Sequence, residues 1–446
     1  MHSPLNRKLY ILFSFFLSTH LFSVPTYQIV VDPGHGGVAK EPVGVHGDKY
    51  DSLTQTFLEK YKQGTESGSL TEREVVLKLA QEVHSVLKLT ETEEGWVQFS
   101  RHLKNFSNEK SFPRVVLKSV LTRNSNYEND PSSEDPNAAY RLYDFPDPKT
   151  GVRRKGRLSF INEQKPHLVL SLHLNPAGKG QKGGMAAVLT PGYKTFHLLK
   201  SISEDKKKPK SFLSSPWSDW MVFVANWSKL ENAVADAWIY FHGYWSDKSG
   251  KKADLDKFEG YRQNMVTWKY ADDKNWENKA KAGGKGPYSK THSGFSAEGA
   301  FWEREKGKKE TWRREGGREG FGGDNYYASR ELMRFVQFGL REQLKDKNGN
   351  YPEVGPIQKP YISTYSLPTY TNAICAFLEI GYINRSRDMK YLTENRKEVA
   401  ISLAVGIYSL FSGMEMRKPK KMPVVPKGKK INWERYENYF SEVTSP

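Results

Sequence analysis

The stretch that decides the fold is Ile29-Val30-Val31-Asp32-Pro33-Gly34-His35-Gly36-Gly37. Its first residues belong to an apolar run, 27–31, that predicts a buried strand, and the glycines on either side of His35 allow a tight turn where that strand ends. Side chains at the carboxyl ends of strands in α/β proteins face the ligand-binding crevice. We therefore expect His35 to face a cleft. The alternative is a glycine-rich turn with an incidental histidine.

The alternation of apolar strand runs with amphipathic helices predicts an α/β fold. We expect a single mixed, mostly parallel sheet with helices on both faces, plus a large Trp-rich insertion. The expected strands are 27–31, 115–122, 168–173, 184–190 and 374–380, and the expected helices are 71–88, 156–163, 328–344 and 389–411. Long polar segments separate these elements at 38–68, 90–112, 124–152 and 194–327.

The same pattern divides the chain into five parts. They are a signal peptide at 1–24, the two parts of one α/β domain at 25–193 and 328–414, an insertion at 194–327, and a basic tail with an aromatic end at 415–446. The insertion carries nine of the eleven tryptophans, together with His242 and His292, to which we assign no role. A segment of this length inside a compact domain predicts a lid or a regulatory subdomain. Within the tail, the segment 417–430 is expected to be a solvated basic linker.

The amino terminus predicts export. Arg7 and Lys8 precede an apolar run, Leu9–Phe22, which is typical of a secretory signal peptide and shorter than the ~20 apolar residues of a transmembrane helix. We expect a mature protein of the periplasm or cell envelope with no transmembrane segment. Removing the two basic residues lowers the formal charge from +17 to +15, which favours anionic envelope polymers over nucleic acid as partners.

Composition limits the chemistry that the chain can carry. With 37% hydrophobic residues among 446, the chain can bury a large core, which excludes wholesale disorder. The single thiol, Cys375, excludes an internal disulfide and a cysteine-rich zinc cluster, so a metal site has to use histidine and carboxylate ligands. A serine hydrolase is disfavoured because Gly294–Gly299 lacks the spacing of a nucleophile elbow.

Two further residues are candidate ligands beside His35. His173 lies near the carboxyl end of strand 168–173, where it can share an ion with His35 because imidazole nitrogen is a preferred zinc ligand. Glu72 lies on the apolar stripe of helix 71–88 and is expected to face the sheet, whereas Glu74 is turned toward solvent. The alternatives are a satisfied core histidine for His173 and, for Glu72, a carboxylate favoured by the helix dipole.

Glu379 is the candidate catalytic base. It lies in the apolar run 373–384, which predicts a strand covered on both faces and ending in an acid beside Gly381. Two histidines and one carboxylate leave a zinc position open for water, and a second carboxylate nearby can take a proton from that water.

In this order, the motifs resemble the zinc-dependent N-acetylmuramoyl-L-alanine amidases of bacterial cell-wall hydrolysis, of the amidase 3 type. The matching stretches are Ile29–Gly37, Thr71–Leu77, Leu121–Arg123, Arg157 with Asn162, Leu170–Asn175 and Leu378–Asn384. The resemblance implies one Zn²⁺ held by His35, Glu72 and His173, with Glu379 as the catalytic residue. It also implies hydrolysis of the amide between the lactyl group and L-alanine of peptidoglycan, in cell-wall turnover or daughter-cell separation.

Some features depart from that pattern. Asn124-Ser125-Asn126 stands where the family usually has an acid, and Leu174 stands where it has a small residue. The insertion falls where related enzymes carry a segment that covers the zinc site, which implies an activator protein as a further partner. One alternative is an amidase-like envelope protein that its insertion holds inactive and that acts as a binding or regulatory module. Another is a zinc peptidase that cuts the stem peptide.

Overall fold

The structure is a computed structural model. It describes residues 24–37, 42–51, 56–59, 62–126, 140–142, 145–146, 153–178, 180, 182–189, 321–358, 360–362, 367–368, 371 and 373–433. The expectations for the signal peptide, for His242 and His292, for nearly all of the insertion and for the aromatic end beyond Trp433 lie outside these residues.

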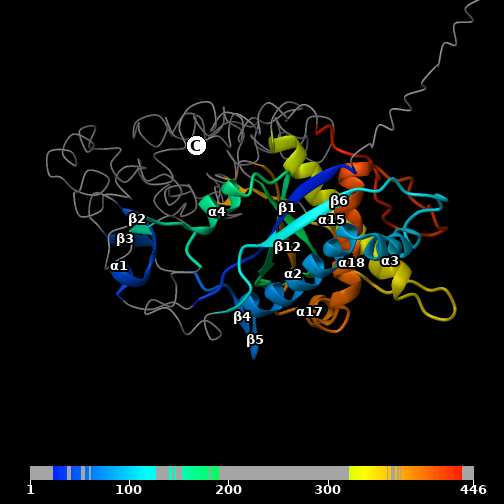
Figure 1. Cartoon of the computed structure of the whole chain (residues 1–446). Helices are drawn as coiled ribbons and strands as arrows, with labels where there is room; N and C mark the ends of the chain where they lie inside the picture. The colour runs from blue at the N-terminus through cyan, green and yellow to red at the C-terminus, as the bar shows by residue number, and fades with distance from the viewer. Residues whose placement is uncertain are drawn as a thin grey trace, which may run out of the picture.

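The centre of the structure is a six-stranded sheet in the order β11-β10-β12-β9-β1-β6 (Figure 1). Its strands are β1 (Thr26–Pro33), β6 (Val116–Leu121), β9 (Leu168–Asn175), β10 (Ala186–Leu189), β11 (Tyr361–Ile362) and β12 (Ile374–Tyr382). Neighbouring strands are parallel except for β10 and β12, which pair antiparallel. The predicted fold class, a mixed and mostly parallel sheet, is confirmed.

Helices cover both faces of this sheet, as predicted. On the first face, alternate strand residues such as Ile29, Leu170 and Ala376 join a large core with α2 (Glu72–Lys88), α15 (Phe321–Gln343) and α18 (Arg396–Ser412). On the second face, Val169 and Phe377 pack with α4 (Arg157–Glu163). The strands therefore read as continuous apolar runs, because both sides of each pleat are buried.

Helix α2 forms where the apolar periodicity predicts it. Its buried stripe, which contains Val76, Leu79 and Val83, follows the i, i+3, i+4 spacing of a helix that packs on one side. Its first residue, Glu72, lies on that stripe, and the Glu72 amide donates to the Thr65 carbonyl oxygen at 2.9 Å. Glu74 accepts a hydrogen bond from the Thr71 hydroxyl at the start of the helix.

Two helical predictions need correction. The segment 90–112, expected to be a polar insertion, contains α3 (Glu93–Leu103), whose Phe99 is buried against Tyr408. The Thr92 hydroxyl caps α3 by accepting from the Gly95 amide. The single helix expected at 389–411 is instead α17 (Ser386–Thr393) followed by α18, because the chain leaves helical geometry at Asn395.

The basic segment 417–430 lies between two residues that are anchored in the core. Its lysines are mostly exposed, but Met416 and Ile431 are buried in the first core. The Trp433 ring stacks on Phe411 at 4.2 Å between centroids, and its indole N–H donates to the Leu410 carbonyl oxygen.

The remaining elements are short. They are α1 (Val43–His46), β2 (Asp48–Asp51), β3 (Thr56–Glu59), β4 (Glu66–Ser67), β5 (Leu70–Thr71), η1 (Leu89–Glu91), β7 (Phe145–Pro146) and β8 (Arg153–Arg154). None of the described helices combines the length and the apolarity that crossing a bilayer requires.

Candidate metal centre

Three adjacent parallel strands, β1, β9 and β12, bring three of the predicted site residues together at their carboxyl ends. His35 follows the end of β1, and His173 lies on β9, which pairs with both β1 and β12. Glu379 on β12 is the direct register partner of His173. The side chains of His173 and Glu379 lie on the second face of the sheet, because each is an even number of residues along its strand from Val169 or Phe377, which pack in the second core. The carboxyl ends of these strands are where an α/β sheet holds its ligands.

The side chains of His35, Glu72 and His173 converge closely enough to share one ion. The Glu72 Oε1 lies 3.2 Å from His35 Nε2 and 3.1 Å from His173 Nδ1, and the two nitrogens lie 3.2 Å apart. A point equidistant from the three atoms lies roughly 1.8 Å from each in their plane, and a small shift out of the plane gives the ~2.0–2.2 Å of zinc bonds. Two imidazoles and a carboxylate also suit zinc chemically. The residues present therefore fit the metal.

The loop 62–65 orients His35. The Lys62 carbonyl oxygen lies 2.8 Å from His35 Nδ1, and a carbonyl only accepts, so Nδ1 carries the proton. Nε2 is then the nitrogen left for a metal, and it is the atom that faces Glu72. A hydrogen bond of this kind fixes the tautomer of histidine ligands in metal sites. The backbone of His35 adopts a left-handed conformation with φ of 61°, which aims the ring at the centre.

Glu72 is held at both carboxylate oxygens. Its side chain is buried, Oε2 accepts from the Thr65 amide at 2.9 Å, and Oε1 accepts from the Leu174 amide at 2.9 Å. Burial by itself raises the pKa of Glu72, but the neighbouring His35 and His173 rings outweigh it and hold that pKa well below its ordinary value. The carboxylate is therefore ionised, which is the state that binds a cation.

The His173 ring lies between Gly34 and Phe377. It stacks on the Phe377 ring at 4.3 Å between centroids with an 11° interplanar angle. On the other side, a Cβ at Gly34 would lie 2.3 Å from His173 Cε1, so only glycine fits there. Burial lowers the pKa of His173, which keeps the ring neutral and able to ligate a metal.

Asp32, which sequence analysis noted only as part of the opening motif, supports the turn from behind. It is fully buried and accepts from the Thr122 hydroxyl, the Ser171 hydroxyl and Arg157 Nη1 at 2.6, 2.8 and 3.0 Å. Although burial acts to raise the pKa of Asp32, the Arg157 guanidinium and the hydroxyl donors lower it below its usual value. An acidic residue within an apolar strand predicts that a buried cation or hydrogen-bond donor pairs with it, as Arg157 does here.

The Arg123 side chain holds the same turn by donating hydrogen bonds to the backbone carbonyl oxygens of the turn. Its Nε donates to the Pro33 carbonyl oxygen, and its Nη2 donates to the carbonyl oxygens of Gly34 and Arg73. The guanidinium thus joins the turn that carries His35 to the helix that carries Glu72. Asn126, which stands close to the position where the resembling family has an acid, accepts from Arg123 Nη1 at 2.8 Å.

Glu379 supplies a second carboxyl beside the three converging side chains. It is 6% exposed, and its Oε2 is buried with no hydrogen-bond partner among the residues that the structure describes. Burial, and then the Glu72 carboxylate, raise the pKa of Glu379 well above its ordinary value. A carboxyl with a raised pKa and an oxygen that has no hydrogen-bond partner among the described residues is suited to accept a proton and return it.

No protein-family model and no curated protein matches the chain. Solved structures that resemble it include the N-acetylmuramoyl-L-alanine amidase AmiC2 of Nostoc punctiforme, at 10% identity and a TM-score of 0.31, covering 85% of this chain and 94% of that one. The amidase Ami1 of Mycobacterium smegmatis has 10% identity and a TM-score of 0.34, covering 86% and 96%. The CwlD amidase of Clostridioides difficile, in complex with the GerS lipoprotein, has 11% identity and a TM-score of 0.30, covering 85% and 96%.

Proposed function

We propose that the chain is a zinc-dependent hydrolase that cleaves the amide between the N-acetylmuramoyl lactyl group and L-alanine in peptidoglycan. The observation that carries the proposal is the convergence of His35 Nε2, Glu72 Oε1 and His173 Nδ1, within 3.2 Å of one another, beside Glu379. The ordered motifs that resemble the amidases, with these residues in register, supply the substrate class.

His35, Glu72 and His173 would hold one Zn²⁺. Zinc bound there would polarise the scissile carbonyl and lower the pKa of a water molecule. The Lys62 carbonyl holds His35 in this orientation, the Thr65 and Leu174 amides hold Glu72, and the Phe377 ring stacks on His173.

Glu379 would move the proton. Its free Oε2 takes a proton from the attacking water as the new C–O bond forms at the lactyl carbonyl. The same carboxyl then gives that proton to the alanine nitrogen as the C–N bond breaks. The products are a lactyl carboxylic acid on the glycan and a stem peptide with a free amino group.

The cellular context belongs to the same proposal. The predicted signal peptide would deliver the chain to the periplasm or cell envelope, where a net positive charge favours association with an anionic peptidoglycan mesh. We propose cell-wall turnover or daughter-cell separation as the process that this activity serves.

The test compares the wild type with Glu379→Gln on purified sacculi in the presence of zinc. The wild type should release stem peptides that begin with free L-alanine, identified by mass spectrometry. Glu379→Gln should keep about one zinc per chain and lose roughly 10²- to 10⁴-fold in rate, which is the range of general-base catalysis. Glu74→Gln, a neighbour of Glu72 on the same helix, is the control and should retain activity.

Two results would reject parts of this proposal. Full activity of Glu379→Gln would remove Glu379 as the base. Fragments cut inside the stem peptide, with the lactyl amide intact, would identify a zinc peptidase instead.

A further inference from the structure

A basic groove of about 830 Å³ lies on the first face of the sheet, away from the candidate metal centre. Its walls are α15, the residues Val354, Pro356–Gln358 and Pro360, and the segment 423–427, and Ala187 of β10 also lines it. Ala187 belongs to the first core, whereas its neighbour Ala186 is the register partner of Glu379. Because successive strand residues face opposite sides, the groove and Glu379 lie on opposite faces of the sheet.

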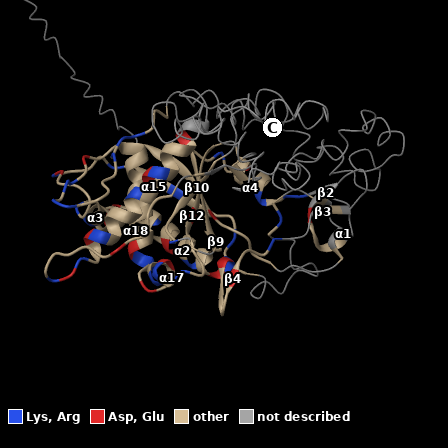
Figure 2. Cartoon of the chain, turned by 180° about the vertical axis from the view of Figure 1, so that it is seen from behind, with Lys and Arg blue, Asp and Glu red and all other residues tan. Residues whose placement is uncertain are grey.

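Among the residues that the structure describes, four basic residues and no acidic one line the groove. Arg330, Arg334 and Arg341 extend from one side of α15, and Lys427 comes from the facing segment. Figure 2 marks the basic positions along α15 in blue. Arg330 and Arg341 are separated by about 16 Å along the helix axis at a rise of ~1.5 Å per residue. The positive charge therefore follows the length of the groove.

Arg341 lacks the counter-ion that its burial calls for. It is 8% exposed, and no described carboxylate lies within 4.0 Å of it, whereas Arg334 pairs with Glu331 at 3.2 Å. Arg341 Nη1 lies 3.5 Å from the Gln337 carbonyl oxygen, at the limit of a hydrogen bond. Buried guanidinium groups are nearly always paired with an anion. An anion in the groove would complete this site.

Gln337, one turn before Arg341, has an unsatisfied acceptor in the same groove. It is 2% exposed, its Nε2 donates to the Gly355 carbonyl oxygen, and its Oε1 is buried without a hydrogen-bond partner in the described part of the chain. An N–H group of a ligand would satisfy Oε1, because native proteins rarely leave such an atom unpaired. A peptide carries both carboxylates and N–H groups, whereas a phosphate polymer carries only the anions.

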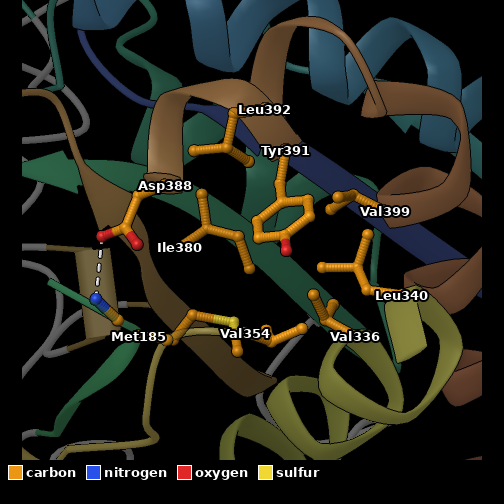
Figure 3. Close-up of a pocket in the computed structure, with 11 residues that line it drawn as sticks. Met185, Val336, Leu340, Val354, Ile380, Asp388, Tyr391, Leu392 and Val399 are labelled. Atoms are coloured by element: carbon orange, nitrogen blue, oxygen red, sulfur yellow. Dashed lines mark hydrogen bonds between the residues drawn. The ribbon is translucent and has the colours of Figure 1, made fainter. Parts of the chain in front are cut away.

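A smaller pocket beside the groove is not the binding site. It shares Val354 with the groove, holds about 20 Å³ and is mostly apolar, with Tyr391 and Ile380 pointing into it (Figure 3). Its one acidic residue, Asp388, accepts from the Gly184 amide at 2.8 Å. That volume admits about one water molecule, so a larger ligand has to occupy the groove.

We propose that the groove binds an extended acidic peptide segment of a partner protein. A span of about 16 Å corresponds to roughly five extended residues at ~3.3 Å each. Carboxylates near both ends of such a segment reach Arg330 and Arg341, and an N–H group reaches Gln337 Oε1. The face on which the groove opens favours a partner over the substrate, whose scissile amide belongs beside Glu379.

Binding is tested by fluorescence anisotropy on the purified full chain, with a fluorescein-labelled nonapeptide of alternating Glu and Ala as the probe. Arg341→Gln should weaken binding roughly ten- to hundredfold, the range for a lost hydrogen bond to a charged group. Lys347→Gln, an exposed site outside the groove lining, is the charge-matched control and should bind as the wild type does. Lys427→Gln removes an exposed groove charge and should cause a smaller loss.

The competing outcomes are distinct. Equal binding of a nonapeptide with Gln in place of Glu, or no effect of Arg341→Gln, would overturn the proposal. Equal competition by polyphosphate of matched charge would reject the peptide chemistry, and displacement of the probe by purified muropeptides would make the groove a substrate subsite. If Arg341→Gln does not fold, Lys427→Gln and Arg330→Gln decide the matter. No hydrolysis enters this assay, so its result is independent of the proposed activity.

Discussion

Replacing Gly34 with alanine should disable the candidate metal centre although no ligand residue is replaced. The new Cβ would lie 2.3 Å from His173 Cε1 and 2.5 Å from both ring nitrogens. The ring has to move by about 1 Å to restore ordinary contact distances, because atoms at such separations overlap. It cannot retreat easily, because Phe377 stacks on its other side at 4.3 Å between centroids.

The expected magnitude follows from these contacts. Overpacking of this kind typically costs ~1–3 kcal/mol of folding stability. A shift of the Phe377 ring would reduce part of this cost. Zinc affinity should fall by at least roughly 10- to 100-fold, the cost of disturbing groups that orient metal ligands, since here a ligand itself moves.

The assay is a competition titration of the purified protein against a chromophoric zinc chelator, with thermal unfolding measured in parallel. Gly68→Ala is the matched control, because Gly68 has a φ of +60° but an added Cβ there meets nothing within 4 Å. It should lose a little stability and keep its zinc affinity. Wild-type affinity in Gly34→Ala would refute the reasoning, because it would mean that the His173 ring is not confined between Gly34 and Phe377.

Three further predictions concern the support of the site and the core. Asp32 has a folded-state pKa below its unfolded value of about 3.9, so the stability it contributes is present at neutral pH and is lost as the pH falls through ~4 and below. Asp32→Asn should therefore flatten the acid limb of the stability profile, as followed by denaturant unfolding between pH 7 and pH 3; an unchanged profile would contradict the pairing with Arg157. Phe99→Ala should lower the free energy of unfolding by ~3–5 kcal/mol, because α3 buries this ring completely; a loss below ~1 kcal/mol would mean that α3 does not pack as described. Zinc added to chelator-treated protein, at a free concentration 100 times the dissociation constant, should stabilise the wild type by ~2.7 kcal/mol. The stabilisation is measured as a higher Tm, and this rise should be absent in His35→Ala.

Much of the sheet could be predicted because its strands are buried on both faces. The segments Ile29–Val31, Leu168–Leu170 and Ile374–Leu378 are continuous and apolar, which is the pattern expected of strands covered on both faces. The reversed direction of β10 could not be predicted, since strand direction depends on the connection and not on the residues of the strand. Helix α3 was missed because Glu93, Glu94 and Arg101 obscure the spacing of its buried residues.

The candidate site divides in the same way. Helical phase alone distinguished Glu72 from Glu74, because burial follows from the position of a residue on a regular helix. The groups that orient the side chains could not be predicted, because most of them are backbone atoms. The Lys62 carbonyl and the Leu174 amide act without regard to the side chains of their own residues, so no residue type signals them.

The short loop 62–65 has a consequence for how many oxygens Glu72 can offer. The Thr65 amide already occupies Oε2, and Gly64 closes over both Glu72 and His35, where an added Cβ would lie 3.0 Å from either side chain. Oε1 faces both His35 Nε2 and His173 Nδ1, so it is the oxygen through which Glu72 would hold a metal. A side chain at position 64 would therefore press on two of the three candidate ligands at once, which makes this glycine part of the scaffold of the site.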